Sequence, residues 1–200
     1  MNKINKFIQR LEYLYWLFLL KIRNILKIDY PLFIENVTVI KNNNKKTKKL
    51  LLLFKTIPII SPISLKLYSH TNYFEVLEII KIFNNKNFDV DVLDRDYKDF
   101  VPNKKYDVFI GVGAGNSGSQ YSKIAKELKS TKNVLMCYGP EPEISKKKTI
   151  ERYDFFNKRH NTNVPTMRVP DKVNILESVK YSNMILAIGE EGTFSFESYK

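Results

Sequence analysis

The segment Tyr106–Gly118, which reads YDVFIGVGAGNSG, decides the fold class of this 200-residue chain. It begins with an apolar run typical of a buried strand, continues through closely spaced glycines and leads into a helical pattern that begins at Ser119. A strand that passes through a glycine-rich turn into a helix is a recurring unit of parallel sheets. The segment therefore predicts an α/β protein.

The alternation of strands and helices continues on both sides of this segment, from residue 50 to residue 200. Apolar runs predict strands at Leu50–Phe54, Phe88–Leu93, Tyr106–Val112, Asn133–Tyr138 and Met184–Ile188. Amphipathic patterns predict helices at Tyr73–Phe83, Ser119–Leu128, Thr149–Lys158 and Lys172–Lys180. Pro58 and Pro62 indicate a loop or an irregular extended stretch over Thr56–Ser64. We expect residues 50–200 to form a Rossmann-like domain, with a mostly parallel sheet and helices on both faces.

Residues 1–30 predict a separate amphipathic helix ahead of this domain. Apolar side chains recur three or four positions apart between Lys3 and Ile28, and Pro31 ends the pattern. The longest apolar run, Tyr13–Leu20, would span about 12 Å as a helix and cannot cross a hydrocarbon core of about 30 Å. The helix therefore either lies at an anionic membrane surface or packs on the domain.

The positive charge of the chain is concentrated toward its N-terminus. Lys and Arg number 33 against 21 Asp and Glu, which gives a net charge of +12. Residues 41–49, which read KNNNKKTKK, predict a basic tether that is either solvated or held against anionic lipid. Nucleic acid is not an expected partner, because the tether lacks the interleaved aromatic and arginine side chains that bind single strands.

The cysteine and histidine content excludes several kinds of site. Cys137 is the only cysteine, so no intrachain disulfide can form, and its apolar neighbours predict a buried, unreactive thiol. His70 and His160 are the only histidines, and neither has a second histidine or a cysteine at metal-ligand spacing. We therefore expect no metal site and no resident cofactor.

The loops after the strands carry the candidate site residues, because open parallel sheets bind ligands beyond the carboxyl ends of their strands. Gly113, Gly115 and Gly118 form a G-x-G-x-x-G pattern, but the acidic residue that a dinucleotide site needs at the end of the next strand is missing. The glycines from Gly111 onward therefore give either a tight turn or a close backbone approach to another ligand. His70 precedes a helix and is either a structural loop residue or a contact to a hydroxylated or phosphorylated ligand.

Two later loops have the same ambiguity. Glu141 and Glu143 lie in the stiff segment after one strand, and Gly189 and Glu190 follow another. These carboxylates either act as a base or bind sugar hydroxyls, or they are exposed loop residues without a function. Arg168 either contacts a phosphate group or lies on the surface.

Several collinear segments resemble the N-terminal half of GT-B-fold glycosyltransferases of the group 1 type. The similar segments are Ser69–Glu75 (SHTNYFE), Asn87–Asp94 (NFDVDVLD), Tyr106–Gly111 (YDVFIG), Glu151-Arg152 with Lys158-Arg159, and Ser182–Gly189 (SNMILAIG) running on to Thr193 and Tyr199. The likeness covers about residues 50 to 200. Two positions depart from the family pattern: Glu141 stands where many relatives have histidine, and Asn183 where aspartate is usual.

The resemblance implies a fold, a reaction and a set of partners. Such enzymes transfer a sugar from a nucleotide-sugar donor, and their N-terminal domain forms the acceptor side of a cleft. We expect residues 50–200 to be that domain, the donor-binding C-terminal domain to be absent, and this chain alone to be inactive. The expected acceptor is a cell-envelope glycan or lipid-linked sugar at the cytoplasmic face of the plasma membrane. The alternative is a non-catalytic, membrane-tethered glycan-binding or interaction module.

The resemblance also implies which residues line that cleft. It places His70, the backbone from Gly111 to Gly115, Glu141 and the Gly189–Gly192 loop, which includes Glu190, at the acceptor side. It assigns no complete catalytic set, because the nucleotide is held mainly by the other domain of the family's fold.

Overall fold

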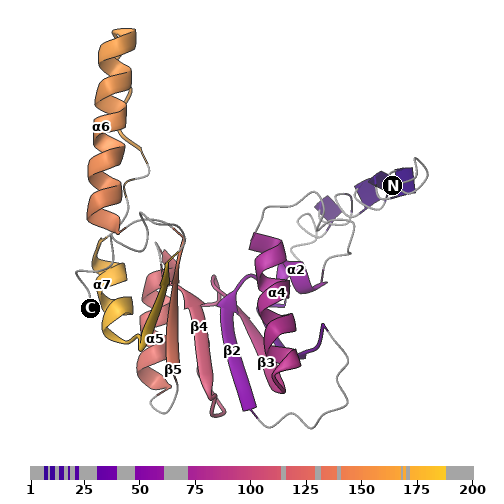
Figure 1. Ribbon diagram of the computed structural model, residues 1–200. Helices are drawn as coiled ribbons and strands as arrows, with labels where there is room; N and C mark the ends of the chain where they lie inside the picture. The colour runs from indigo at the N-terminus through magenta and orange to yellow at the C-terminus, as the bar shows by residue number, and fades with distance from the viewer. Residues whose placement is uncertain are drawn as a thin grey trace. The chain divides into compact units, whose positions relative to one another are not determined.

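A computed structural model describes most of the chain from residue 31 to residue 187. The described residues are 7, 8, 10, 11, 14, 15, 18, 21, 22, 31–39, 48–60, 72–113, 116–128, 132–138, 141–167, 169 and 172–187. The chain divides into two compact units, residues 1–97 and 98–200. Each unit combines strands with helices (Figure 1), so the predicted α/β class is confirmed.

Between residues 31 and 97, the described part of the first unit contains three paired strands and two helices. Its elements are β1 (Phe33–Val37), β2 (Lys48–Phe54), α2 (Ile57–Ile60), α4 (Asn72–Asn85) and β3 (Phe88–Asp94). β2 and β3 run parallel in unbroken register from Lys48 beside Phe88 to Phe54 beside Asp94. β1 lies on the other side of β3 and runs antiparallel to it. Helix α4 connects the two parallel strands and packs against β3.

The core of the first unit explains why β2 forms where it does. Leu50, Leu51, Leu52 and Leu53 are all fully buried, so both faces of the strand are covered. A continuous apolar run without alternation is typical of a strand in a parallel sheet. The strand begins two residues earlier than expected, at Lys48, inside the stretch predicted as a basic tether.

Strand β1 was not expected from the sequence, and polar side chains from distant positions hold it in place. The Asn36 N–H donates to Asp91 Oδ1 at 2.9 Å, and Asn36 has a positive φ of 52° at an irregularity in the β1–β3 register. Asn84 Nδ2 donates to the Val37 carbonyl at 3.2 Å, while Asn84 Oδ1 accepts from the Val39 N–H at 2.9 Å. These bonds join β1 to β3 and α4, so the ordered fold begins before the basic stretch.

In the second unit, the residues that the structure describes form a parallel sheet of three strands with helical connections. Its elements are β4 (Val108–Val112), α5 (Asn116–Glu127), β5 (Lys132–Cys137), α6 (Pro142–His160), α7 (Lys172–Lys180) and β6 (Met184–Ala187). The strand order is β4-β5-β6, and every neighbouring pair is parallel. Helices α5 and α7 pack side by side on the sheet.

Aromatic and amide side chains lock the layers of the second unit together. Tyr121 of α5 stacks on Phe109 of β4 with ring centroids 4.9 Å apart, and its hydroxyl lies 2.9 Å from Ser182 Oγ. Asn133 at the start of β5 donates through Nδ2 to the carbonyls of Ala125 at 3.2 Å and Tyr181 at 3.0 Å. The ends of α5 and α7 are therefore tied to the same strand.

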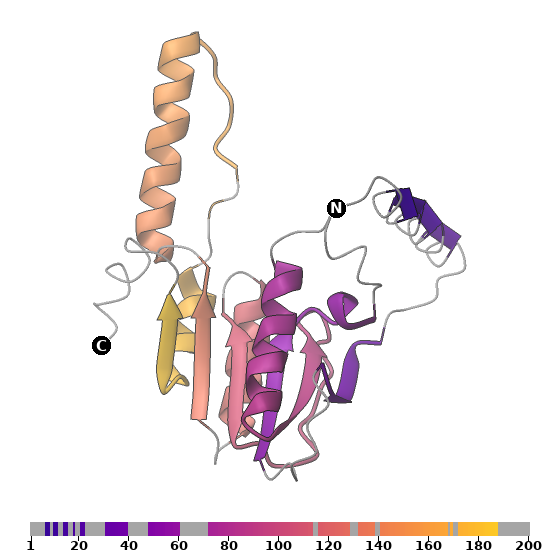
Figure 2. The ribbon, with the colours of Figure 1, turned by 45° about the vertical axis from the view of Figure 1, so that its right-hand side comes forward.

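Helix α6 is much longer than the expected Thr149–Lys158 and begins seven residues earlier, at Pro142. Four residues separate the end of β5 from the start of the helix, and the helix extends beyond the carboxyl end of that strand (Figure 2). Asn161 ends the helix in the left-handed conformation, with φ 48°. The chain then turns back along the helix, because Asn157 binds both backbone groups of Val164, at 2.8 Å and 3.0 Å.

The strands and helices predicted after residue 50 are present, and one predicted loop differs in part. The predicted loop over Thr56–Ser64 is wrong for Ile57–Ile60, which forms a helical turn. Proline is tolerated in the first turn of a helix, where its missing N–H has no partner to lose, and this accounts for Pro58. The expected helix over residues 1–30 lies mainly outside the described residues, and the coverage of both sheet faces by helices stays a prediction.

Candidate functional site

The carboxyl edge of the second unit's sheet carries the described members of the predicted site. Val112, Cys137 and Ala187 end β4, β5 and β6 at this edge, because the three strands are parallel and in register. Gly113 follows the first of these strands and Glu141 follows the second. Two residues 28 positions apart in the sequence are thus brought to neighbouring strand ends.

Gly113 has a packing role in addition to any ligand it contacts. Its N–H donates to the Met136 carbonyl at 3.3 Å and so extends the β4–β5 pairing by one bond. A Cβ atom at this position would overlap the side chain of Leu135, which is fully buried. Gly111, two residues earlier, is a buried strand residue paired with Leu135. The glycine pattern is therefore explained in part by the close approach of two parallel strands.

Glu141 is buried and serves as the N-cap of α6. The residue is 5% exposed, and its Oε2 accepts hydrogen bonds from the N–H groups of Glu143 at 2.8 Å and Ile144 at 3.1 Å. A carboxylate suits this position, because the first N–H groups of a helix have no partner within the helix and carry partial positive charge. Pro142 follows at the first helical position, where its fixed φ favours helix initiation. Glu141 is thus held in place at the N-terminus of α6, four residues after β5 ends.

The other predicted site residues are not placed by the structure. His70, Gly115, Arg168, Gly189 and Glu190 lie outside the described residues. Their proposed role at the cleft therefore stays a prediction, whereas Gly111, Gly113 and Glu141 have defined positions.

A second polar cluster lies at the carboxyl ends of β2 and β3 in the first unit. Asp94 is 4% exposed, and its Oδ2 accepts from the backbone N–H and the hydroxyl of Thr56 at 3.0 Å and 3.2 Å. Its Oδ1 accepts from Lys55 Nζ at 3.2 Å and from the Asp96 N–H at 3.0 Å. Lys55 also forms an ion pair with the Asp96 carboxylate. The four donors fix the two loops that leave these strands.

Sequence reasoning did not single out this cluster. Asp94 entered only as the last residue of a motif, and Lys55 and Thr56 were assigned no role. The available signal was an acidic residue directly at the end of an apolar strand, which is the usual location of ligand-binding side chains in such sheets. In the structure the carboxylate is occupied by protein donors, so the cluster is a structural lock.

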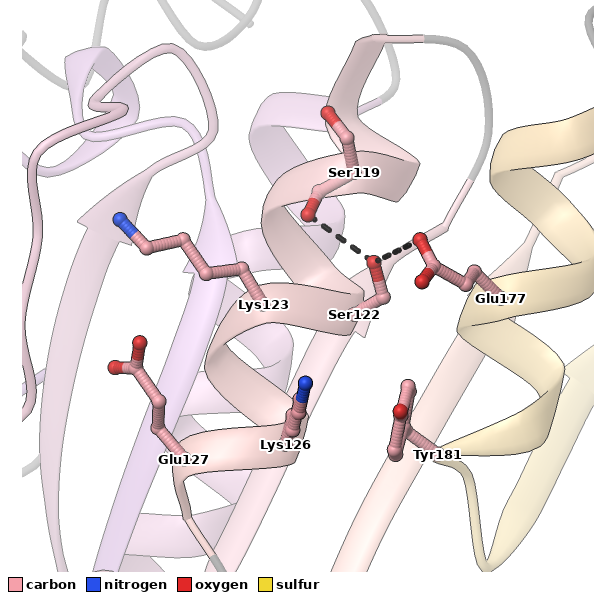
Figure 3. A pocket seen from close by; sticks show the side chains of 7 residues that line it. All are labelled: Ser119, Ser122, Lys123, Lys126, Glu127, Glu177 and Tyr181. Atoms are coloured by element: carbon pink, nitrogen blue, oxygen red, sulfur yellow. Dashed lines mark hydrogen bonds between the residues drawn. The ribbon is translucent and has the colours of Figure 1, made fainter.

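A pocket of about 450 Å³ lies between α5 and α7 (Figure 3). It is lined by Ser119, Ser122, Lys123, Lys126, Glu127, Glu177 and Tyr181. Ser122 Oγ donates to the Ser119 carbonyl at 3.1 Å and contacts Glu177 Oε2 at 3.5 Å. Two lysines and two glutamates line the pocket, so its charge favours neither an anion nor a cation. No predicted site residue lines this pocket.

Cys137, at the end of β5, is buried and free of disulfides, as predicted. Burial raises the pKa of its thiol from 9.0 to about 12. The reactive thiolate is therefore scarce at neutral pH, and Cys137 is unsuited to act as a nucleophile.

Among the residues that the structure describes, no helix has the length and apolar character needed to cross a bilayer. The same residues contain no group of three or more His, Cys, Asp or Glu side chains that could hold a metal ion.

Comparisons of the chain with protein-family models, curated proteins and solved structures find no match.

Proposed function

We propose that residues 50–200 form the acceptor-side domain of a glycosyltransferase that uses a nucleotide-sugar donor. The acceptor would be a cell-envelope glycan or a lipid-linked sugar. The observation that carries this proposal is the shared strand edge of Gly113 and Glu141, at the position where sheets of this kind bind ligands. The mostly parallel α/β architecture supports the motif resemblance over the same residues.

A side-chain carboxylate and backbone groups would have different roles at this edge. Glu141 is fixed by two backbone N–H groups, so it would present a rigid carboxylate edge to an acceptor hydroxyl. Backbone groups beyond Gly113 would supply further hydrogen bonds to sugar hydroxyls. The donor nucleotide would bind mainly to a separate domain, as the family resemblance implies.

The test measures glycan binding and turnover with the full chain. Binding of lipid-linked and cell-envelope saccharides is measured by titration calorimetry, and turnover is measured as nucleoside diphosphate release after a downstream donor domain is supplied. The proposal expects binding by the chain alone and turnover only with the second domain. Absence of both binding and turnover under every pairing would refute it.

A matched pair of variants tests the assignment of Glu141. Glu141→Ser keeps an N-capping oxygen but removes the carboxylate, whereas Glu143→Ser changes an exposed glutamate two residues away. We expect the first variant to weaken glycan binding and the second to leave it unchanged, with both retaining the native far-ultraviolet circular dichroism spectrum. Equal binding by the two variants would remove Glu141 from the site.

The second candidate function is a non-catalytic glycan-binding module. It is favoured by the commitment of Glu141 to the helix cap, which makes this carboxylate a poor general base. Persistent glycan binding without turnover under any pairing would support it.

We also propose that residues 1–30 hold the protein at the cytoplasmic face of an anionic membrane. Scattered described residues between Phe7 and Ile22 have helical backbone, which supports an interfacial helix. Flotation with anionic liposomes, comparing the full chain with a variant in which Phe7, Leu14 and Phe18 are replaced by serine, tests this. Equal flotation of the two proteins would argue against it.

A further inference from the structure

The parallel strands of the second unit have two faces, and helices α5 and α7 lie on one of them. Phe109 of β4 points to this face, because its ring stacks on Tyr121 of α5. Asn133, its register partner on β5, points the same way and donates to the Ala125 carbonyl of α5. Helix α7 packs beside α5. The helices therefore cover the face of the sheet that carries Phe109 and Asn133.

The opposite face becomes more exposed from β4 toward β6. Side chains alternate along a strand, so on β4 this face carries Ile110, which is 6% exposed. On β5 it carries Val134 and Met136, which are half-buried. On β6 their register partners, Met184 and Leu186, are 56% and 45% exposed. Two large apolar side chains of β6 are thus exposed on one face, here called the open face.

Strand β6 is also the last strand in the order of the sheet, and it is the yellow arrow beside β5 in Figure 2. An edge strand with exposed apolar side chains is a template for pairing with a further strand. Charged side chains protect many natural edges, but the sequence of β6, MILA, contains none. A further strand with apolar side chains on the open face would protect this edge.

The chain continues from β6 into a sequence that fits this requirement. Residues 188–192 read IGEEG, and loops of three to five residues that contain glycine are typical of β-hairpins. Residues 193–197 read TFSFE, in which polar and apolar residues alternate as in a strand with one buried face. The segment next to β6 in the sequence therefore has the pattern of its antiparallel partner.

The register of such a hairpin places both phenylalanines on the open face. With residues 188–192 as the loop, Phe194 lies opposite Leu186. Two steps further along both strands, Phe196 lies opposite Met184. Residues directly opposite each other on antiparallel strands share a face and interact. A slip of one residue would turn both phenylalanines toward the face that the helices cover.

We propose that residues 193–197 form an antiparallel edge strand on β6, in which Phe194 and Phe196 cover the open face. This contact lies within the second unit and does not depend on glycosyl transfer. It would protect the edge of the sheet from pairing with a second copy of the chain. It would also fix Glu190, inside the loop, beyond the carboxyl end of β6.

The first experiment compares the oxidation of Met167 and Met184 in the full chain by dilute hydrogen peroxide, followed by peptide mass spectrometry. The two residues have nearly the same exposure in the structure, 58% and 56%. Covering by Phe196 should make Met184 oxidise at least about threefold more slowly than Met167. Phe196→Ser should remove this difference. Tyr199→Ser, the control, removes an aromatic ring outside the proposed strand and should preserve it.

The second experiment tests the register by disulfide trapping in a Cys137→Ala background, which leaves no other cysteine. Leu186→Cys is combined either with Phe194→Cys or with Ser195→Cys, whose side chain would point to the opposite face. The two pairs are equilibrated in glutathione buffers, and the effective concentration of the two thiols is measured for each. We expect a value at least about tenfold higher for the first pair, because its two cysteines lie directly opposite each other.

Each experiment has an outcome that contradicts the proposal. Equal oxidation rates of Met167 and Met184 in the wild-type chain would show that the open face is uncovered. Equal effective concentrations for the two cysteine pairs would refute the register. Slow oxidation of Met184 that persists in Phe196→Ser and is lost on dilution would identify a second copy of the chain as the cover.

Discussion

Replacing Asp94 by asparagine should destabilise the first unit by about 2 to 3 kcal/mol. The wild-type carboxylate accepts four hydrogen bonds, two on each oxygen, from Thr56, Lys55 and the Asp96 N–H. Asparagine has the same shape but only one accepting oxygen. Its amide group must therefore face either the Thr56 N–H or the Asp96 N–H, and that N–H loses its partner.

The magnitude follows from these contacts and from the burial of the site. A buried N–H without a partner costs about 1 to 3 kcal/mol, and the remaining bonds lose the strength that a charged acceptor gave them. Part of the cost is recovered, because the Thr56 hydroxyl can rotate and accept from the new amide. Asp94 is almost fully buried, so water cannot replace the lost acceptor.

The assay is urea unfolding at pH 7 followed by far-ultraviolet circular dichroism, with hydrogen exchange of the β2 and β3 amides to locate the loss. The matched control is Asp96→Asn, which removes the same charge from the same lysine on a side chain that is 70% exposed. Exposed ion pairs contribute about 0 to 1 kcal/mol, so the control should change stability little. The free energies of unfolding of the two variants are then compared. If they differ by less than about 0.5 kcal/mol, roughly the error of such measurements, the stabilising role assigned to Asp94 is refuted.

Three further predictions concern the second unit. Gly113→Ala should lower the free energy of unfolding in urea by about 1 to 3 kcal/mol, because the new Cβ overlaps Leu135. The double variant with Leu135→Ala should lose less stability than the sum of the two single variants. Additive losses would contradict this reasoning. Glu141→Ala should lower the stability of the protein by about 0.5 to 2 kcal/mol, whereas Glu141→Asn, which keeps a capping oxygen, should lower it much less. Equal melting temperatures of the two variants in thermal melts would exclude the capping role. Because the pKa of Cys137 is raised from 9.0 to about 12 in the folded chain, the unfolded chain loses this proton first, so stability should fall as pH rises above about 9. Cys137→Ala should make that alkaline decline shallower in urea unfolding across pH, and an unchanged slope would count against the burial of the thiol.

The strands were predictable where burial on both faces leaves a continuous apolar run. Leu50–Phe54 has such a run, and its pattern needs no knowledge of the rest of the fold. Strand β1 lacks this signal, because its sequence FIENV contains polar residues at its centre. It forms through bonds to Asn84 and Asp91, which are more than forty residues away in the sequence. Such pairings are not encoded in any local pattern.

The candidate site was predictable as a location but not as a set of contacts. The end of β4 and the end of β5 are recognisable from apolar runs followed by Gly and Pro. The reason for a glycine at position 113 requires knowing that Leu135 faces it from the next strand. The start of α6 was missed because glutamate is not among the preferred capping residues, and the Gly-Pro before it indicates a loop.

The position of β1 fixes how far the protein can move from any surface that residues 1–30 bind. A flexible tether at residues 41–49 would have let the sheet diffuse over a distance of about 30 Å from its anchor. Strand β1 begins at Phe33 and is joined to β3, so residues 41–47, which precede β2, come after this attachment point in the sequence. Four residues, 29–32, separate Ile28 from Phe33, and the five Cα–Cα steps between these two residues reach at most about 18 Å. If residues 1–30 were bound to a surface, the first unit would therefore stay close to that surface. Strand β1 would restrict the orientation of this unit, whereas a long flexible linker would allow many orientations.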